Sequence, residues 1–149
     1  MSLIVQKFGG TSVRDAKRIR NVAGIIAETY LAGNDVIVVL SAQGDTTDDL
    51  IAKAEEINPH ASKREMDMLL STGEQISCSL CAMAIEAMGY PVVSLTGWQA
   101  GFRTNSSYGD ARIKRIDTER VLAELDKNTI VIVTGFQGLN KYEDITTLG

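Results

Sequence analysis

The sequence predicts an α/β fold, a three-layer αβα sandwich around a mainly parallel sheet, and three observations support this prediction. Short segments rich in β-branched residues and nearly continuous in apolar character recur along the chain, as in strands covered on both faces. The segments between them place apolar residues at helical spacing. Strands and helices alternate, which is typical of βαβ units. The 149 residues, 44% of them hydrophobic, suit about one domain.

The first half of the chain predicts two strands and two helices in alternation. Leu3–Phe8 and Asp35–Leu40 have the composition of buried strands. An apolar stripe over Val13–Tyr30 predicts a helix between them, and Gly33 is a suitable stop. A second helix opens at Thr46–Asp49, where a hydroxyl can cap it and two acids suit the positive end of the helix dipole.

The second half opens with a long helix. Ser62–Glu65 is a capping-box pattern, and the helix is expected to reach Met88, with Thr72-Gly73 as a candidate interruption and Gly89 as its stop. The remaining predicted elements are, in order, a weaker strand, a short edge strand, a helix and a buried strand: Pro91–Leu95, Arg112–Ile116, Asp117–Leu125 and Thr129–Thr134.

Composition excludes several classes of function. The net charge of −4, from 15 basic and 19 acidic residues, makes the chain a poor candidate for non-specific nucleic-acid binding. The longest apolar run, Val36–Leu40, is far shorter than the roughly 20 residues of a membrane-spanning helix. No signal-peptide pattern opens the chain, and two cysteines fit a reducing compartment. We therefore expect a cytoplasmic protein without nucleic-acid or membrane partners.

The loops after the predicted strands are the places to look for a site, because ligands bind beyond the carboxyl ends of parallel strands. In the first loop, Gly9 and Gly10 let the backbone approach a ligand, a helix start offers free N–H groups with Thr11 or Ser12 as its cap, and Lys7 adds a cation. This combination indicates a phosphate site, and the alternative is a tight turn beside an exposed lysine. Neither a Walker A loop nor a Gly-x-Gly fingerprint is present.

The other loops offer hydroxyls, a carboxylate and aromatics. Ser41–Thr47 can bind a small polar ligand or merely cap a helix. Glu74 lies between two apolar stretches, so its carboxylate is either on a solvated helix face or directed at a cationic group. Gly97-Trp98-Gln99 and Gly135-Phe136-Gln137 follow strands, and in both the aromatic ring can simply pack under its loop. Cys78 and Cys81 form a CxxC pair that we interpret as core packing, because no second pair completes a zinc site.

Taken together, these segments resemble one family. Val5–Val13, which holds Lys7-Phe8-Gly9-Gly10, resembles the opening signature of the aspartokinases, within the amino acid kinase superfamily. Ser41-Ala42 with Thr47, and Thr72-Gly73-Glu74, resemble the second and third motifs. Three more family motifs are matched in order by Thr96–Gly101, Gly135–Gly138 and Thr146–Gly149.

The resemblance implies ATP-dependent phosphorylation of the side-chain carboxylate of L-aspartate, the first step of lysine, threonine and methionine biosynthesis. It implies Mg²⁺ bound through the nucleotide, no metal site on the protein, and a homo-oligomer in the full-length enzyme. Lys7 is implied as the catalytic residue, and Lys7, Phe8, Gly9 and Gly10 as the nucleotide-binding segment. The residues implied to line the aspartate pocket are Ser41, Thr47, Glu74 and Phe136.

The resemblance also implies a truncated chain. Gly149 falls inside a motif that continues in the family with an arginine and Gly-Gly-Ser-Asp. Residues 1–149 are therefore expected to be the N-terminal portion of the catalytic domain, without the adenine-binding half and the regulatory ACT domains, and inactive alone. The alternatives are a glutamate or acetylglutamate kinase and a non-catalytic small-ligand-binding module. The missing Gly-x-Gly disfavours a Rossmann-type dehydrogenase.

Overall fold

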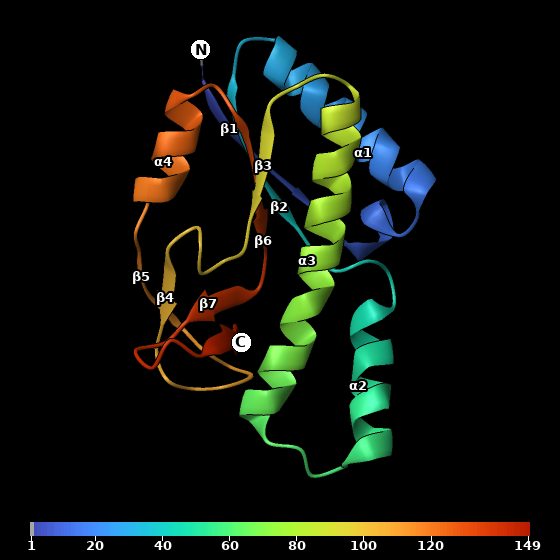
Figure 1. Ribbon diagram of the computed structural model, residues 1–149, viewed down its shortest axis with the longest axis vertical. Helices are drawn as coiled ribbons and strands as arrows, with labels where there is room; N and C mark the ends of the chain where they lie inside the picture. Colours follow the sequence, from blue (N-terminus) through green and yellow to red (C-terminus); the bar gives the residue numbers. More distant parts are fainter. Residues whose placement is uncertain (1) are drawn as a thin grey trace.

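The computed structural model describes residues 2–149 and confirms the α/β fold with a mainly parallel central sheet. All strands of this sheet run parallel, in the order β1-β2-β6-β3 (Figure 1). Their bounds are Leu3–Phe8 for β1, Asp35–Leu40 for β2, Ile130–Thr134 for β6 and Val92–Leu95 for β3. The four segments predicted as its strands are thus confirmed.

Helices cover both faces of this sheet, which gives three layers (Figure 1). The helices are α1 (Ala16–Leu31), α2 (Thr46–Ile57), α3 (Lys63–Ala87) and α4 (Glu119–Asp126), with a 3-10 turn, η1, at Gly10–Val13. On one face, α1 and α3 bury a core that includes Ile26, Val38, Ile85 and Ile132. On the other face, α4 packs Leu125 against the β6 strand in a second core cluster. The expected sandwich is therefore present, and apolar burial on both faces holds it together.

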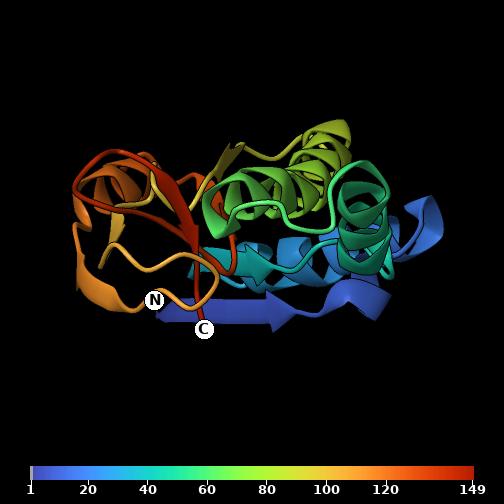
Figure 2. The same ribbon diagram turned by 90° about the horizontal axis from the view of Figure 1, so that it is seen from below.

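The edge strand β1 departs from the prediction that it is buried on both faces. Its residues alternate between exposed and half-buried, and Leu3 and Val5 are 54% and 61% exposed. The reason is its place in the sheet: β1 is the edge strand, and α4 packs over β6 instead (Figure 2). One face of β1 therefore has no covering layer among the described residues.

A second, mixed sheet follows the carboxyl end of the first, in the order β5-β4-β7-β8. Its strands are β4 (Phe102–Thr104), β5 (Ile113–Ile116), β7 (Gln137–Leu139) and β8 (Ile145–Thr147). The predicted edge strand at Arg112–Ile116 is confirmed as β5. The other three have only three residues each, too short for a periodic pattern, so the sequence did not predict them.

Two predicted helix caps are wrong. Thr11 and Ser12 belong to η1, and α1 begins after Asp15, whose carboxylate accepts the N–H of Arg18 at 2.9 Å. Helix α2 begins after Asp45 and has no side-chain cap, so the threonine hydroxyls of the second loop do not cap it. An aspartate just before each helix holds the cap position that a hydroxyl was expected to fill.

The long helix α3 behaves as predicted at both ends. The Ser62 hydroxyl accepts the N–H of Glu65 at 3.2 Å, and Gly89, with φ 89°, follows the last turn. The candidate interruption at Thr72-Gly73 is not present, and the helix is continuous. By length and composition alone α3 could cross a membrane, but it packs against α1, α2, β3 and β8, as a core helix does.

Candidate functional site

A cavity of about 680 Å³ lies at the carboxyl edge of the parallel sheet, where the loops after β1, β2 and β6 meet α3. It is lined by Val5, Lys7, Gly10, Val39, Ser41, Ala42, Gly44, Thr47, Glu74, Gly135, Phe136, Leu148 and Gly149. Six of the eight residues predicted for nucleotide or aspartate binding are thus brought together. The topology explains this, because neighbouring parallel strands end at the same edge of a sheet.

The first two loops are held against one another at Gly10. The N–H of Gly44 donates to the carbonyl of Gly10 at 2.9 Å, and a Cβ atom at Gly10 would lie 2.7 Å from the carbonyl oxygen of Ala42. Only a glycine fits there without displacement. A Cβ atom at Gly9, in contrast, would meet nothing within 4 Å. The backbone at Gly9 is therefore open to an incoming group.

The two remaining predicted residues, Phe8 and Gly9, do not line this cavity. The Phe8 side chain packs against the core on the α1 side of the sheet. It also lines a separate hollow with Arg18 and Val22 of α1. The Phe8 side chain is therefore separate from the cavity that the other predicted residues line.

The second loop is fixed to α3, which places its hydroxyls. The Ser77 hydroxyl donates to the carbonyl of Ser41 at 2.6 Å. A Cβ atom at Gly73 would lie 2.9 Å from Cβ of Ala42 and 3.6 Å from Cγ2 of Thr46. Thr46 therefore packs against α3, and its neighbour Thr47 lines the cavity.

Glu74 is the central ionisable group of the site. Its side chain on α3 is only 5% exposed, which excludes the solvated helix face that the sequence left open. Burial raises the pKa of this carboxyl to about 7, and hydrogen bonds from its own backbone and from Gln137 offset only part of that rise. A carboxylate held in this way gains more from a cationic ligand than a solvated one does.

Phe136 turns the chain between β6 and β7 in a strained conformation. Its φ is 72°, in the left-handed region that a bulky residue rarely adopts, and the residue is 47% exposed and lines the cavity. The N–H of Leu148 donates to its carbonyl at 2.9 Å and holds this turn. Backbone strain of this kind persists where the surroundings over-determine it, commonly at binding sites.

Two buried polar residues build the site without a role predicted from the sequence, which did not name Asp67 and named Gln137 only as part of a motif. Asp67, 1% exposed on α3, accepts the N–H and hydroxyl of Thr147 at 3.0 and 2.7 Å and the N–H of Gly109 at 3.0 Å. It thereby anchors β8, which leads into the cavity wall at Leu148. Gln137, at the start of β7, donates to the carbonyl of Ser71 and to Glu74. These contacts join residues more than 40 positions apart, so no local pattern could reveal them.

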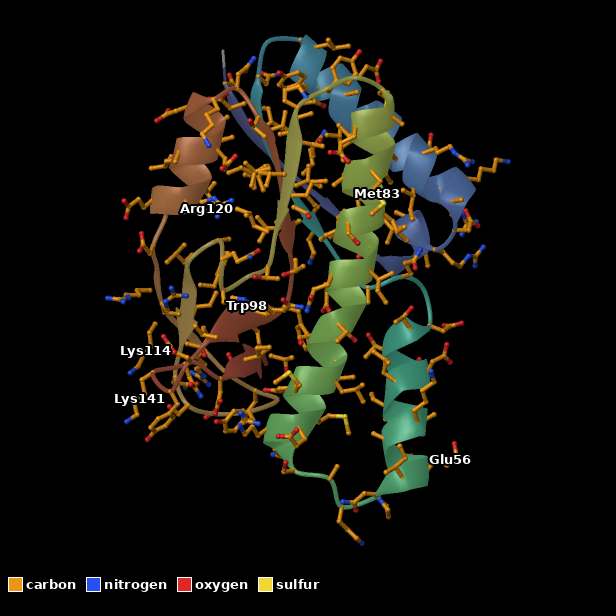
Figure 3. The ribbon with its side chains drawn as sticks, in the orientation of Figure 1. Glu56, Met83, Trp98, Lys114, Arg120 and Lys141 are labelled. Atoms are coloured by element: carbon orange, nitrogen blue, oxygen red, sulfur yellow. The ribbon has the colours of Figure 1, made fainter. Side chains whose placement is uncertain are left out.

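The cysteine pair is confirmed as core packing. Cys78 and Cys81 are buried free thiols on α3, and burial raises the pKa of both, that of Cys81 to about 11. Across residues 2–149, no three His, Cys, Asp or Glu side chains gather as a metal site. Trp98 lies in the turn between β3 and β4, close to β7 (Figure 3). The carbonyl of Trp98 accepts a hydrogen bond from the guanidinium group of Arg103 at 3.1 Å.

Taken together, the parallel sheet, the glycine-lined first loop and a cavity with a lysine, hydroxyls and a buried carboxylate define an α/β protein with a candidate site for small charged ligands at the carboxyl ends of its strands. The chain belongs to the amino acid kinase family: the family described as "Amino acid kinase family" matches residues 2–149.

Curated relatives are aspartokinases. The chain is 57% identical to the aspartokinase of Geobacillus stearothermophilus and 55% identical to that of Corynebacterium glutamicum, over its whole length and over 37% and 36% of theirs. It therefore spans about a third of the length of these relatives. Among solved structures it is similar to aspartate kinase from Synechocystis, with TM-score 0.83 and 43% identity over 99% of this chain and 24% of that one. Escherichia coli aspartokinase III with lysine and aspartate gives TM-score 0.84 at 25% identity, over 97% of this chain and 43% of that one.

Proposed function

We propose that the chain forms the aspartate-binding part of an aspartate kinase, which phosphorylates the side-chain carboxylate of L-aspartate to 4-phospho-L-aspartate with ATP. Identities of 50–57% to aspartokinases support this proposal, as does the likeness to a structure that contains aspartate. Because the chain spans about a third of its relatives, the whole reaction is proposed for a longer enzyme. The adenine-binding half and any ACT domains would belong to the part outside this chain.

The observation that carries the proposal is Glu74, a buried carboxylate at a cavity, with a pKa raised to about 7. The α-ammonium group of an amino acid supplies the charge that this carboxylate lacks. Ser41 and Thr47 line the same cavity and offer hydroxyls to the carboxylates of such a substrate. Acetylglutamate has no free ammonium group, so Glu74 favours an amino acid over an acetylated one.

The charges explain how the chain would assist phosphoryl transfer. A carboxylate oxygen of the substrate forms a bond to the terminal phosphorus while the bond to the leaving ADP oxygen breaks. The substrate carboxylate is already ionised at neutral pH, so no general base is needed, and alignment and charge neutralisation remain as the catalytic tasks. Lys7 can offset the repulsion between the two anions, and the open backbone at Gly9 can face the phosphates. Bound Mg²⁺-ATP would supply the phosphoryl group and further positive charge.

Calorimetric titration of the 149-residue chain tests the substrate. We expect L-aspartate to bind, and succinate, which lacks only the ammonium group, to bind at least about tenfold more weakly. Equal binding of succinate and aspartate would remove the role of Glu74, and tighter binding of L-glutamate would favour a glutamate kinase.

Hydroxylamine trapping tests the reaction. With ATP and L-aspartate, a longer enzyme that contains this chain should form aspartyl hydroxamate, whereas a non-catalytic binding module would form none. The chain alone is expected to form none, and hydroxamate from it would contradict our assignment of the adenine site to other residues.

The remaining proposals concern location and assembly. The two buried free thiols support a cytoplasmic location. A homo-oligomeric state is proposed for the longer enzyme.

A further inference from the structure

The side chain of Gln137 connects three segments of the site. It is 1% exposed at the first position of β7, and its Nε2 donates to the carbonyl of Ser71 at 2.6 Å and to Oε2 of Glu74 at 3.4 Å. Its Oε1 accepts the hydroxyl of Thr134, at the end of β6, at 2.7 Å. The Thr134 hydroxyl in turn accepts the N–H of Gly97, from the loop after β3, at 2.7 Å.

This chain of hydrogen bonds is consistent with only one orientation of the Gln137 amide. The Thr134 hydroxyl has one proton, and its oxygen already accepts from Gly97, so it is free to donate that proton to Oε1 of Gln137. A flipped amide would set Oε1 against two acceptors, the Ser71 carbonyl and the Glu74 carboxylate, and would leave the Thr134 proton facing an NH₂ group. Both nitrogen protons therefore face α3.

The consequence falls on Glu74. The only side-chain hydrogen bond to its carboxylate among the described residues comes from Gln137, whose own position is fixed by Thr134 and Ser71. Its ionisable neighbours are the buried thiol of Cys78, one turn further along α3, and Lys7 on the same cavity. Because the Gln137 amide is a neutral donor, it can hold the Glu74 carboxylate toward the cavity and leave the negative charge without a counter-charge. A lysine in the place of Gln137 would neutralise that charge.

We propose that Gln137 is a positioning residue for substrate binding, which holds the Glu74 carboxylate at the cavity so that it can receive the substrate ammonium group. The inference rests on the proposed function in the identity of the substrate. The contact between Gln137 and Glu74 does not depend on it and can be measured without ligand.

The test compares Gln137→Leu with a matched control, Gln99→Leu. Gln99 holds the corresponding place in the other glycine–aromatic–Gln loop, where its Oε1 accepts the N–H of Thr96 at 3.0 Å, and it does not line the Glu74 cavity. Carbon-13 NMR of the side-chain carboxyl groups follows Glu74 in the free chain. We expect Gln137→Leu to raise the pKa of Glu74 by at least about half a unit, because a hydrogen bond to the charged form is lost, and Gln99→Leu to leave it unchanged.

The same variants are then titrated with L-aspartate. Gln137→Leu should weaken binding at least about 1.5-fold at pH 7.5, which is the loss of ionised Glu74 that a half-unit rise in its pKa gives, and this deficit should nearly vanish at pH 8.5 as Glu74 ionises again, a pH dependence that a merely structural loss would not show. If Gln137→Leu fails to fold, Thr134→Val removes the hydroxyl that orients the amide, and Thr134→Ser restores it. An unchanged Glu74 pKa and unchanged aspartate affinity would overturn the inference. A wild-type chain that binds no aspartate, with the Glu74 pKa still raised by Gln137→Leu, would overturn the proposed substrate instead.

Discussion

Two buried carboxylates lie two turns apart on α3, and their surroundings differ in kind. Asp67 accepts three hydrogen bonds, two from Thr147 and one from Gly109, and so is satisfied within the protein. Glu74 receives one side-chain hydrogen bond, long at 3.4 Å, and its pKa is raised to about 7. Burial is similar, at 1% and 5% exposed, so burial alone does not separate a structural carboxylate from a binding one. The number of hydrogen-bond partners separates the two, because a buried carboxylate without enough partners costs free energy until a cation binds to it.

The largest expected effect is at Asp67. Asp67→Ala leaves the N–H groups of Thr147 and Gly109 without their acceptor, so we expect a loss of roughly 3–5 kcal/mol in the free energy of unfolding. Urea denaturation followed by circular dichroism measures it. A loss below about 1 kcal/mol would mean that Asp67 is not the structural member of the pair.

Glu74→Gln should raise the free energy of unfolding, whereas Asp67→Ala should lower it. The raised pKa means that the folded state favours the protonated carboxyl, so the ionised form costs stability once the pH exceeds the unfolded value of 4.5. The variant should therefore be roughly 3 kcal/mol more stable than the wild type at pH 8, and the gain should vanish near pH 4.

The same urea denaturation at both pH values checks this gain, and aspartate titration should show that the more stable variant no longer binds. A variant that is less stable than the wild type at pH 8 would mean that Glu74, like Asp67, is a structural carboxylate.

The first loop offers a smaller contrast of the same kind between Gly10 and Gly9. Gly10→Ala forces a Cβ atom against the carbonyl of Ala42, and we expect a loss of about 1–3 kcal/mol. Gly9→Ala meets open space and has an ordinary φ of −80°, so its stability should change by less than about 0.5 kcal/mol. Thermal unfolding separates the two, and equal losses would contradict the packing described for this loop.

Gly9→Ala should still weaken binding of inorganic triphosphate, if its open backbone faces the phosphates as proposed. Lys7→Ala serves as the positive control, because it removes the cation beside the same loop while Glu74 is untouched. Unchanged triphosphate affinity in both variants would remove the first loop from the phosphate site.

The sequence predicted the parts of this molecule that follow from local pattern. Periodicity identified the parallel strands and the helices, and strand ends identified the loops that form the cavity. The short strands β4, β7 and β8 pair with partners distant in sequence, and three residues carry no period, so they were missed.

In the candidate site, too, the residues that stand out in a local pattern were predicted and those defined by distant contacts were not. Lys7 and Glu74 were named because a charge stands out in an apolar segment, and the resemblance gave each a role. Asp67 was missed, and Gln137 was named only as part of a motif, because the contacts that tie each of them to the site reach partners 42 to 80 residues away. The exposed face of β1 likewise depends on which strand each helix covers, and composition does not record that.

The central claim is that Glu74 is buried with no ion pair to another described residue, so that it can take the ammonium group of a substrate. Carbon-13 NMR titration of the Glu74 carboxyl, with and without saturating L-aspartate, tests it most directly. We expect a pKa of about 7 in the free chain and a value lower by at least about one unit in the presence of aspartate. An ordinary pKa in the free chain, or one that aspartate leaves unchanged, would contradict the claim.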